Sequence, residues 1–303
     1  MNRTLAAALL LLCAVLWGMA FVAQKSAMQY MSPLTFAFVR YFLGAFLVTP
    51  LAIAEYRRQR RKGLVVTTAQ WVLIGILSLA FFAGVWLQQA ALETTTVTNG
   101  GFLTSLYVIL TPVVTYVTLR TRPHPIVYVG APLAMLGIYL LTGADVSRFT
   151  AGDIMLLFGA VCWAVQVALL GQLVRETGLP VFVSVINFYA TAILAMLGAF
   201  AFEHPALGAV GSGWVEIVYS GIFSTGVAFT LQAIGQQYVP PANAAIVLSS
   251  ESLFAAFGGA VIFGERLPPL GYVGAAIIFV AIILVEAIPA WRARRAVTVP
   301  GSA

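Results

Sequence analysis

The sequence predicts an all-α membrane protein with ten transmembrane helices, arranged as two inverted repeats of five helices each. Three observations carry this prediction: a very apolar composition, ten apolar segments of bilayer-spanning length, and an internal repeat. Of the 303 residues, 61% are hydrophobic and only 9% are charged, and the mean hydropathy is +0.97. Soluble domains carry about 25% charged residues, so this composition excludes a water-soluble globular protein.

The apolar segments are long enough to cross a bilayer, which takes about 20 consecutive apolar residues in a helix. Charged runs and breaks rich in Pro or Gly separate them. The ten segments are 4–24, 33–54, 70–91, 95–118, 125–143, 152–174, 180–202, 213–236, 241–263 and 269–289. The first resembles a signal peptide, but it continues to Ala23 without a clear cleavage site, so we interpret it as an uncleaved first span.

The internal repeat is visible when residues 231–285 are placed on residues 87–141 without a gap. Polar residues inside apolar runs coincide in this alignment, which shared composition does not explain. The matched pairs include Gln88 with Gln232, Asn99 with Asn243, Ser105 with Ser249, and Arg122 with Arg266. The chain is therefore a duplication. We place the first repeat at 4–143, the second at 152–289, and a cytoplasmic tail at 290–303.

The orientation follows from the distribution of Lys and Arg. With the N-terminus inside, the inner loops hold twelve basic residues and the outer loops hold three, namely Lys25, Arg148 and Arg266. This asymmetry predicts a multi-pass membrane protein with both termini cytoplasmic. One repeat contains five spans, an odd number, so the second repeat must enter the membrane from the opposite side.

Inverted repeats are the usual architecture of secondary transporters, in which two equivalent halves exchange inward-open and outward-open shapes around a central site. No phosphate-binding loop of the G-x-x-x-x-G-K-[ST] type occurs. We therefore expect transport driven by a gradient, with no cofactor and no metal. Clustered catalytic residues are not seen at membrane depth, so an intramembrane enzyme is disfavoured.

Polar side chains at membrane depth are costly and tend to face the interior of a helix bundle. The repeat selects Gln88 with Gln232 and Asn99 with Asn243 as candidate residues for a substrate cavity. The alternative is that they form hydrogen bonds between helices, which is the interpretation we favour for the pair Ser105 and Ser249.

The centres of several predicted helices hold further candidates. Trp17 and Trp163 lie near the middle of the first helix of each repeat, where they can stack on a substrate or simply fill the core. Glu251 lies deep in segment 241–263, and its counterpart in the first repeat is Tyr107. We predict that Glu251 faces the cavity and serves in proton coupling or in contact with a substrate ammonium group. Tyr107 is assigned to substrate binding.

Two other residues inside predicted helices admit simpler interpretations. Arg40 lies about two turns into segment 33–54. It can bind an anionic substrate or pair with a carboxylate, but we expect its long side chain to reach the outer interface. Pro112 interrupts segment 95–118 and predicts a kink there.

Several short motifs, in this order and spacing, resemble one known family. They are Leu16-Trp17-Gly18 with Phe21-Val22, Ser32-Pro33-Leu34-Thr35, Gly101-Phe102, Thr111-Pro112-Val113, Pro240-Pro241, Glu251-Ser252 and Gly264-Glu265-Arg266-Leu267. Together they resemble the two copies of an EamA-type domain, found in the drug/metabolite transporter superfamily. Amino-acid exporters of the YddG type are one branch of it.

The resemblance implies a ten-helix inner-membrane carrier that exports amino acids, other metabolites or toxic compounds. We therefore expect an exporter of amino acids or similar small metabolites that works by alternating access around a midplane cavity. The alternative is a translocase for lipid-linked substrates or drug cations, with an enzyme less favoured. The expected partners are a small solute and the lipid bilayer, with no nucleic acid, and a monomer is one option for the oligomeric state.

Overall fold

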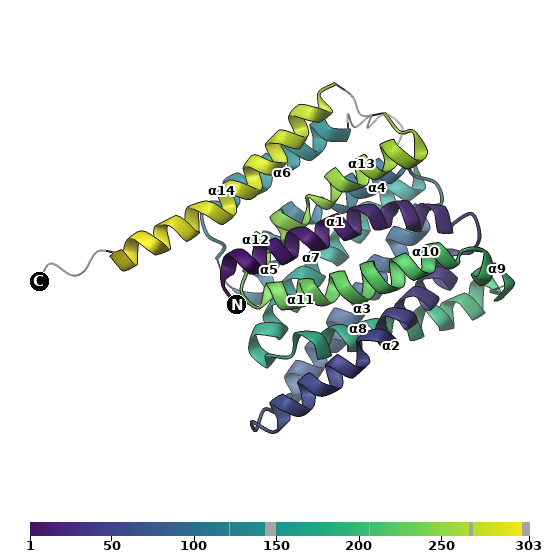
Figure 1. Cartoon of the computed structure of the whole chain (residues 1–303), viewed down its shortest axis with the longest axis horizontal. Helices are drawn as coiled ribbons and strands as arrows, with labels where there is room; N and C mark the ends of the chain where they lie inside the picture. The colour runs from purple at the N-terminus through teal and green to yellow at the C-terminus, as the bar shows by residue number, and fades with distance from the viewer. Residues whose placement is uncertain (121, 143–149, 206, 267–268, 299–303) are drawn as a thin grey trace, which may run out of the picture.

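The computed structural model describes the chain except residues 121, 143–149, 206, 267–268 and 299–303. The described residues are helical, and no strand occurs among them. Figure 1 shows the helices packed as one bundle, with α6 (Val127–Thr142) and α14 (Gly271–Thr298) side by side along one edge. The helix α14 continues past the predicted end at residue 289. Arg148 and the last five residues of the predicted tail lie outside the described part.

Eight helical stretches are long and apolar enough to cross a membrane. Two shorter apolar helices, Val127–Leu140 and Gly271–Leu284, match the fifth and tenth predicted segments. Large apolar side chains are exposed on the surface of the bundle, among them Phe158 at 65% and Phe46 at 66%. Such a surface suits lipid and not water. The helical membrane fold is confirmed, while the count of ten spans stays a prediction for the two shorter helices.

Local sequence signals account for many helix ends. Thr67 begins α3 (Thr68–Ala91) and Thr150 begins α7 (Ala151–Thr177), and each forms a capping box with the residue three positions later. Proline occupies the first position of α2 (Pro33–Arg60) and α8 (Pro180–Gly198), where its missing N–H costs nothing. The helix α1 (Arg3–Ala27) begins after Asn2, whose side chain accepts a hydrogen bond of 2.8 Å from the N–H of Leu5.

The fourth and ninth predicted segments are each broken into two helices. The first is α4 (Val97–Thr104) followed by α5 (Tyr107–Leu119), and the second is α12 (Pro241–Leu248) followed by α13 (Glu251–Phe263). Tight i to i−3 hydrogen bonds carry the backbone through both breaks. The breaks meet, because Ser105 Oγ donates to the carbonyl of Ser249 at 3.3 Å. The break lies at Ser105 and Leu106, not at Pro112, which is inside α5.

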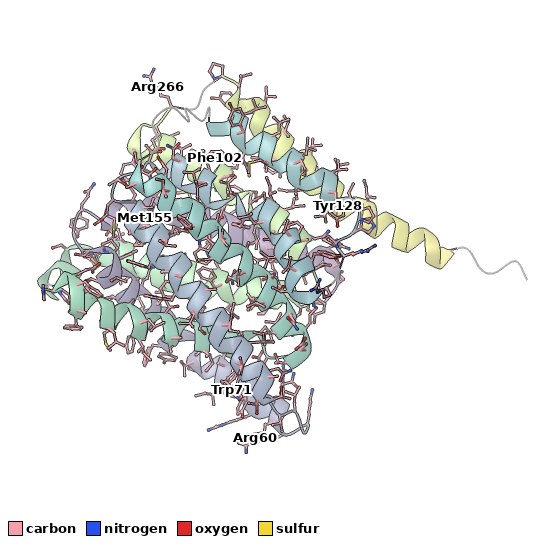
Figure 2. The ribbon with its side chains drawn as sticks, turned by 180° about the vertical axis from the view of Figure 1, so that it is seen from behind. Arg60, Trp71, Phe102, Tyr128, Met155 and Arg266 are labelled. Carbon is pink, nitrogen blue, oxygen red and sulfur yellow. The ribbon has the colours of Figure 1, made fainter. Side chains whose placement is uncertain are left out.

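Equivalent helices of the two halves pack against equivalent neighbours. α3 packs along α7, and its equivalent, the π-helix η3 (Tyr219–Phe229), packs along α1. α1 also packs on α13, and the equivalent α7 packs on α4 and α5. A two-fold relation between repeats produces such an exchange of neighbours. Arg60 and Arg266 lie at opposite sides of the molecule (Figure 2).

Glutamates tie the ends of α2 and α8 to each other. Glu203, at the end of the π-helix η2 (Ala199–Glu203) that extends α8, accepts hydrogen bonds of 2.9 Å from the N–H groups of Leu34 and Thr35. Glu55, near the end of α2, accepts one of 2.8 Å from the N–H of Phe182. Each carboxylate therefore satisfies the unpaired donors at the start of the other helix. The two helices are fastened at both ends.

The short helices α10 (Trp214–Val218) and α11 (Thr230–Gln236) complete the eighth predicted segment around η3, and α9 (Leu207–Ser212) precedes it. This stretch runs opposite to α1: Glu216 accepts from Ser26 Oγ at 2.7 Å near the end of α1, and Gly235 faces Leu10 near its start. A π-helix of this length is rare, and it has no equivalent in the regular α3.

Candidate functional site

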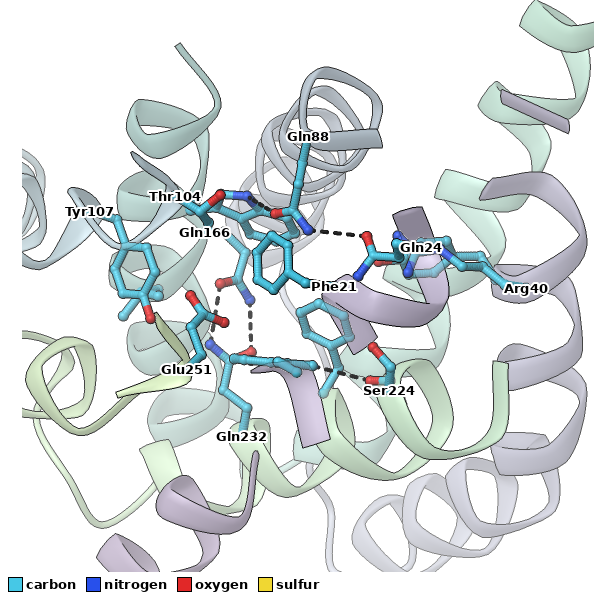
Figure 3. A pocket seen from close by; sticks show the side chains of 15 residues that line it. Phe21, Gln24, Arg40, Gln88, Thr104, Tyr107, Gln166, Ser224, Gln232 and Glu251 are labelled. Carbon is cyan, nitrogen blue, oxygen red and sulfur yellow. Dashed lines mark hydrogen bonds between the residues drawn. The ribbon is translucent and has the colours of Figure 1, made fainter. Parts of the chain in front are cut away.

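A cavity lies in the centre of the bundle, between the two halves (Figure 3). Both repeats contribute to its wall, and most of its side chains are buried. The lining residues are Trp17, Phe21, Gln24, Arg40, Tyr41, Gln88, Thr104, Tyr107, Trp163, Gln166, Val167, Ser224, Phe229, Gln232 and Glu251. The cavity volume is about 30 Å³, far below the roughly 300–1,000 Å³ of pockets that hold a small-molecule ligand. The structure therefore shows a contracted site, whose walls must move to admit a solute.

Amide side chains cross the bundle on two levels. Near the end of α1, Gln88 donates to Gln24 Oε1 at 3.1 Å and accepts from Trp163 Nε1 at 3.0 Å. Near the start of α1, Gln166 and Gln232 bond to each other in both directions, at 3.1 and 3.2 Å. Figure 3 shows both sets of bonds at the cavity wall. One amide pair thus lies in the cavity wall toward each end of α1.

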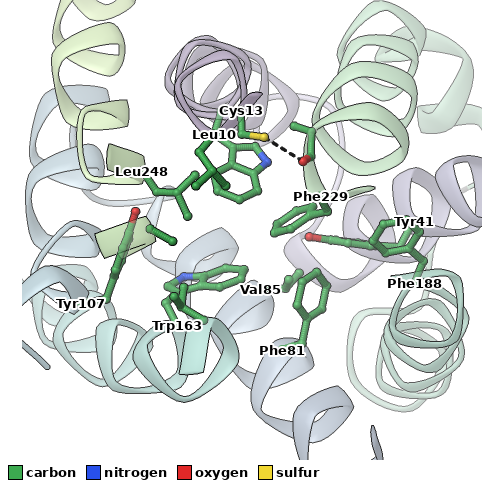
Figure 4. Close-up of a cluster of buried hydrophobic side chains, with 14 of the residues drawn as sticks. Leu10, Cys13, Tyr41, Phe81, Val85, Tyr107, Trp163, Phe188, Phe229 and Leu248 are labelled. Atoms are coloured by element: carbon green, nitrogen blue, oxygen red, sulfur yellow. Dashed lines mark hydrogen bonds between the residues drawn. The ribbon is translucent and has the colours of Figure 1, made fainter. Parts of the chain in front are cut away.

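Aromatic rings pack together beside the cavity and form the centre of the largest apolar cluster (Figure 4). The ring centroids of Trp17 and Phe229 are 4.5 Å apart, and those of Trp163 and Phe229 are 6.0 Å apart with nearly parallel planes. Trp17 also donates its indole N–H to the carbonyl of Ser224, 3.2 Å away in the π-helix η3. Both tryptophans are therefore held in fixed orientations, with flat apolar faces at the site.

The two helix breaks bring Tyr107 and Glu251 to the same place. Tyr107 is the first residue of α5, and Glu251 is the first residue of α13. Each side chain is 4% exposed, and the Tyr107 hydroxyl points toward the Glu251 carboxyl (Figure 3). A carboxyl at this depth is favourable only where hydrogen bonds, a cation or a proton compensate it. The start of α13 supplies partial positive charge at this point.

Two buried polar atoms at the cavity have no hydrogen-bond partner. They are Arg40 Nε and Thr104 Oγ1. Buried polar groups are nearly always paired in folded proteins, and those that are not need an explanation. Two such atoms at one cavity indicate a site that offers hydrogen bonds to a polar ligand.

The structure brings six of the eight predicted site residues together. Gln88, Gln232, Trp17, Trp163, Tyr107 and Glu251 line the cavity. Asn99 and Asn243 do not, so their predicted place in its wall is wrong for this structure. Each is the third residue of an eight-residue helix, α4 or α12, and lies toward the end that is farther from the helix break.

Arg40 departs from the expected position at the membrane interface. Its side chain is only 2% exposed and lines the cavity. The residues Gln24 and Gln166 also belong to the site, although neither is matched by the repeat. Their signal was a Gln inside an apolar helix, which is costly unless it faces a polar space. The phenylalanines of the wall carry no such signal.

Metal-ligand chemistry finds no basis in the described residues, where no group of three His, Cys, Asp or Glu side chains could hold an ion. Cys13 and Cys162 are free thiols. Cys13 Sγ donates to the carbonyl of Ala228 at 3.1 Å, so it packs as a small helix-facing residue.

Comparisons with known proteins agree with this architecture. The EamA-like transporter family matches the chain twice, over residues 4–143 and 150–287. An uncharacterized transporter of Archaeoglobus fulgidus is 31% identical over 91% of this chain and 84% of its own length. The uncharacterized transporter YwfM of Bacillus subtilis is 25% identical over 92% and 93%.

Two further likenesses are more limited. The threonine/homoserine exporter RhtA of Escherichia coli is 29% identical over 51% of this chain and 52% of its own length. A solved crystal structure superposes with a TM-score of 0.76 at 20% identity, over 97% of this chain and 99% of that one, which shows the same fold. With two family matches that together span nearly the whole sequence, the chain belongs to the EamA-like transporter family.

Proposed function

We propose that this transporter exports amino acids or similar small metabolites by alternating access around the central cavity. The observation that carries the proposal is the cavity itself, which lies between the two halves and has one amide pair toward each end of α1 in its wall. We propose that each pair closes the cavity toward one face of the membrane. Breaking one pair while keeping the other opens the site to one face only, as alternating access requires. The likeness to the exporter RhtA supports amino acids as the substrate class.

The proposed setting is a bacterial inner membrane with both termini in the cytoplasm. Its support is the unequal distribution of basic residues between the two faces. Arg57, Arg58, Arg60, Arg61 and Lys62 form one run at the end of α2 and the turn after it. A polar and nearly enclosed site suits a small solute better than a lipid-linked one, which would need a groove open to the bilayer.

Counterflow in proteoliposomes tests the proposal. The vesicles are preloaded with a pool of unlabelled amino acids, and the uptake of each labelled amino acid is followed with and without an imposed pH gradient. Transient accumulation of at least one amino acid is expected, because a carrier exchanges internal for external substrate. If folded protein accumulates none of them, the amino-acid class is rejected, and drug cations and lipid-linked substrates become the candidates.

Glu251 is the proposed group for proton coupling or for contact with a substrate ammonium. Its carboxyl is buried in the cavity wall next to the only hydroxyphenyl group at the helix breaks, Tyr107. Removing the charge by Glu251→Gln keeps the shape of the side chain. We expect the variant to lose the response of transport to a pH gradient and to transport at least tenfold more slowly. Equal rates with the same pH dependence as the wild type would reject this role.

A further inference from the structure

Arg40 is a buried cation whose surroundings do not balance its charge. Its side chain is 2% exposed, and none of the described carboxylates lies within ion-pair distance of it. The guanidinium carbon lies 4.8 Å from the ring centre of Tyr41 and 5.2 Å from that of Phe36. Cation–π contacts with two rings stabilise the guanidinium only in part, since burying a charge costs more free energy than such contacts contribute.

The guanidinium also keeps unused donors at the cavity. Its Nε makes no hydrogen bond, and Figure 3 shows the side chain pointing from α2 toward the cavity. Arginine presents a planar fork of N–H groups that fits a carboxylate with two parallel hydrogen bonds. What is missing at this position is therefore an anion with the shape of a carboxylate.

The two-fold relation between the halves argues that Arg40 does not serve the fold. Its counterpart in the second half is Asn187, which is also 2% exposed but accepts a hydrogen bond of 2.6 Å from Ser78 and does not line the cavity. Glu251 likewise has a neutral counterpart in the other half, Tyr107. At both pairs of positions the neutral residue is as deeply buried as the ionisable one.

The side chains of Arg40 and Glu251 approach the cavity from opposite sides, with Phe21 between them in the view of Figure 3. When Glu251 is ionised, the site carries no net charge but is strongly dipolar. A solute with only one charge would leave either the guanidinium or the carboxylate uncompensated, and each would then carry its full desolvation cost.

We propose that Arg40 determines substrate specificity by binding a carboxylate of the solute, so that the site selects zwitterions with the carboxylate toward Arg40 and the ammonium toward Glu251. This inference rests on the proposed transport of amino-acid-like solutes. It adds the residue that distinguishes an amino acid from an amine or an ester. It also excludes simple organic cations as good substrates, because they repel Arg40.

The test compares an amino acid that the wild type accumulates with its amide, which keeps the ammonium but has no carboxylate. We expect the wild type to prefer the acid by about 100-fold in half-saturating concentration. Arg40→Gln is expected to weaken acid uptake at least tenfold and to bring the acid-to-amide ratio close to one. Arg40→Lys, which keeps the charge without the planar fork, is expected to retain an intermediate preference. Arg175→Gln, at the exposed end of α7, is the matched control and should leave the ratio unchanged.

Several outcomes would overturn the inference. One is an unchanged acid-to-amide ratio in folded Arg40→Gln, and another is a wild type without preference for the acid. A third is a result showing that Arg40 pairs with Glu251 in another state of the transporter. In that case the double variant Arg40→Gln/Glu251→Gln would recover the acid uptake lost in Arg40→Gln, whereas a carboxylate-binding role predicts no recovery.

A binding measurement separates this inference from the proposed function. Trp17 and Trp163 line the cavity, so ligand binding in detergent can be followed by quenching of tryptophan fluorescence without any transport. If counterflow fails but the wild type binds acid more tightly than amide and Arg40→Gln does not, transport is rejected and the role of Arg40 stands. If the acid shows no advantage in binding either, both are rejected.

Discussion

At the scale of single residues, the site is defined by polar atoms that hold one another in place. Trp163 is the clearest case, because its indole N–H reaches Gln88, which in turn reaches Gln24. This chain joins α7 of the second half to α3 and α1 of the first. Trp163 therefore links the two halves, and its surroundings change when the halves move relative to each other. Its aromatic face also lines the cavity.

The variant Trp163→Phe tests this role. Phenylalanine keeps an aromatic ring but leaves Gln88 Oε1 without its donor, and an unsatisfied buried acceptor costs about 1–3 kcal/mol. We expect a roughly tenfold loss of transport, since 1.4 kcal/mol corresponds to a factor of ten. The measurement is the initial rate of counterflow. Trp214→Phe is the control, because Trp214 is 61% exposed and outside the cavity; equal losses in the two variants would contradict the assignment.

The residues found from the sequence show what an internal repeat can and cannot reveal. Gln88 and Gln232 can be recognised because polar residues recur at equivalent depths in two apolar segments. Glu251 is recognisable as a carboxylate deep inside an apolar segment, and Tyr107 as its counterpart. The sequence places Arg40 at the interface, since its distance from the helix end does not tell which way a long side chain turns. Its burial depends on the neighbouring elements η3 and α8, which pack on α2. Such packing cannot be predicted from the sequence of a single segment.

At the scale of elements, the breaks in the two equivalent segments are the main departure from the predicted helices. Periodicity and composition predict one continuous span for 95–118 and for 241–263. The actual breaks place Ser105 against Ser249 and require partners from the opposite half, so they arise only in the assembled bundle. The π-helix η3 likewise depends on packing against another element. It lies close to α2, where a Cβ atom at Gly221 would be 3.1 Å from the backbone oxygen of Arg40.

The close approach of α1 to α13 fixes the position of Glu251. A Cβ atom at Gly18 would lie 2.6 Å from the backbone oxygen of Glu251 and 2.8 Å from the backbone nitrogen of Ala255. Backbone atoms cannot move aside as a flexible side chain can, so any larger residue at this position must separate the two helices. Glycine here gives the contact that holds the start of α13 at the cavity.

We therefore expect Gly18→Ala to lower the thermal stability of the purified transporter and to reduce transport at least tenfold, even though alanine favours helices. Overpacking of this kind costs about 1–3 kcal/mol. Gly75→Ala in α3 is the control, because no atom lies within 4 Å of its added Cβ, and it should be neutral or stabilising by up to about 1 kcal/mol. Wild-type stability and transport in Gly18→Ala would show that this contact does not position Glu251.

At the scale of the whole molecule, the two halves form a nearly symmetric frame around an asymmetric centre. The frame is fastened where α2 and α8 cap each other through Glu55 and Glu203, and these links do not involve the cavity. The moving parts are then expected among α1, α3, α7 and α11, which carry the two amide pairs. Movement of these helices against a fixed frame would open one pair at a time.

Accessibility of the cavity from each face tests this mechanism. In a background with Cys13→Ala and Cys162→Ala, a cysteine replaces Val167 in the cavity wall and is labelled with a membrane-impermeant maleimide in right-side-out and inside-out vesicles. Gln166→Leu removes both bonds of the Gln166–Gln232 pair, worth about 1–3 kcal/mol in all at membrane depth. We expect labelling from the face where α1 begins to rise roughly tenfold, while labelling from the other face falls.

The reciprocal variant, Gln24→Leu, opens the pair near the end of α1 and should shift labelling toward the other face. Gln172→Leu is the matched control, since Gln172 lies on the same helix as Gln166 but bonds only to Glu176 and does not line the cavity. Opposite shifts in the two variants, with none in the control, are what two gates in one alternating cycle produce. Equal labelling from both faces in all variants would mean that the amide pairs are interior packing, and alternating access would then need another pair of gates.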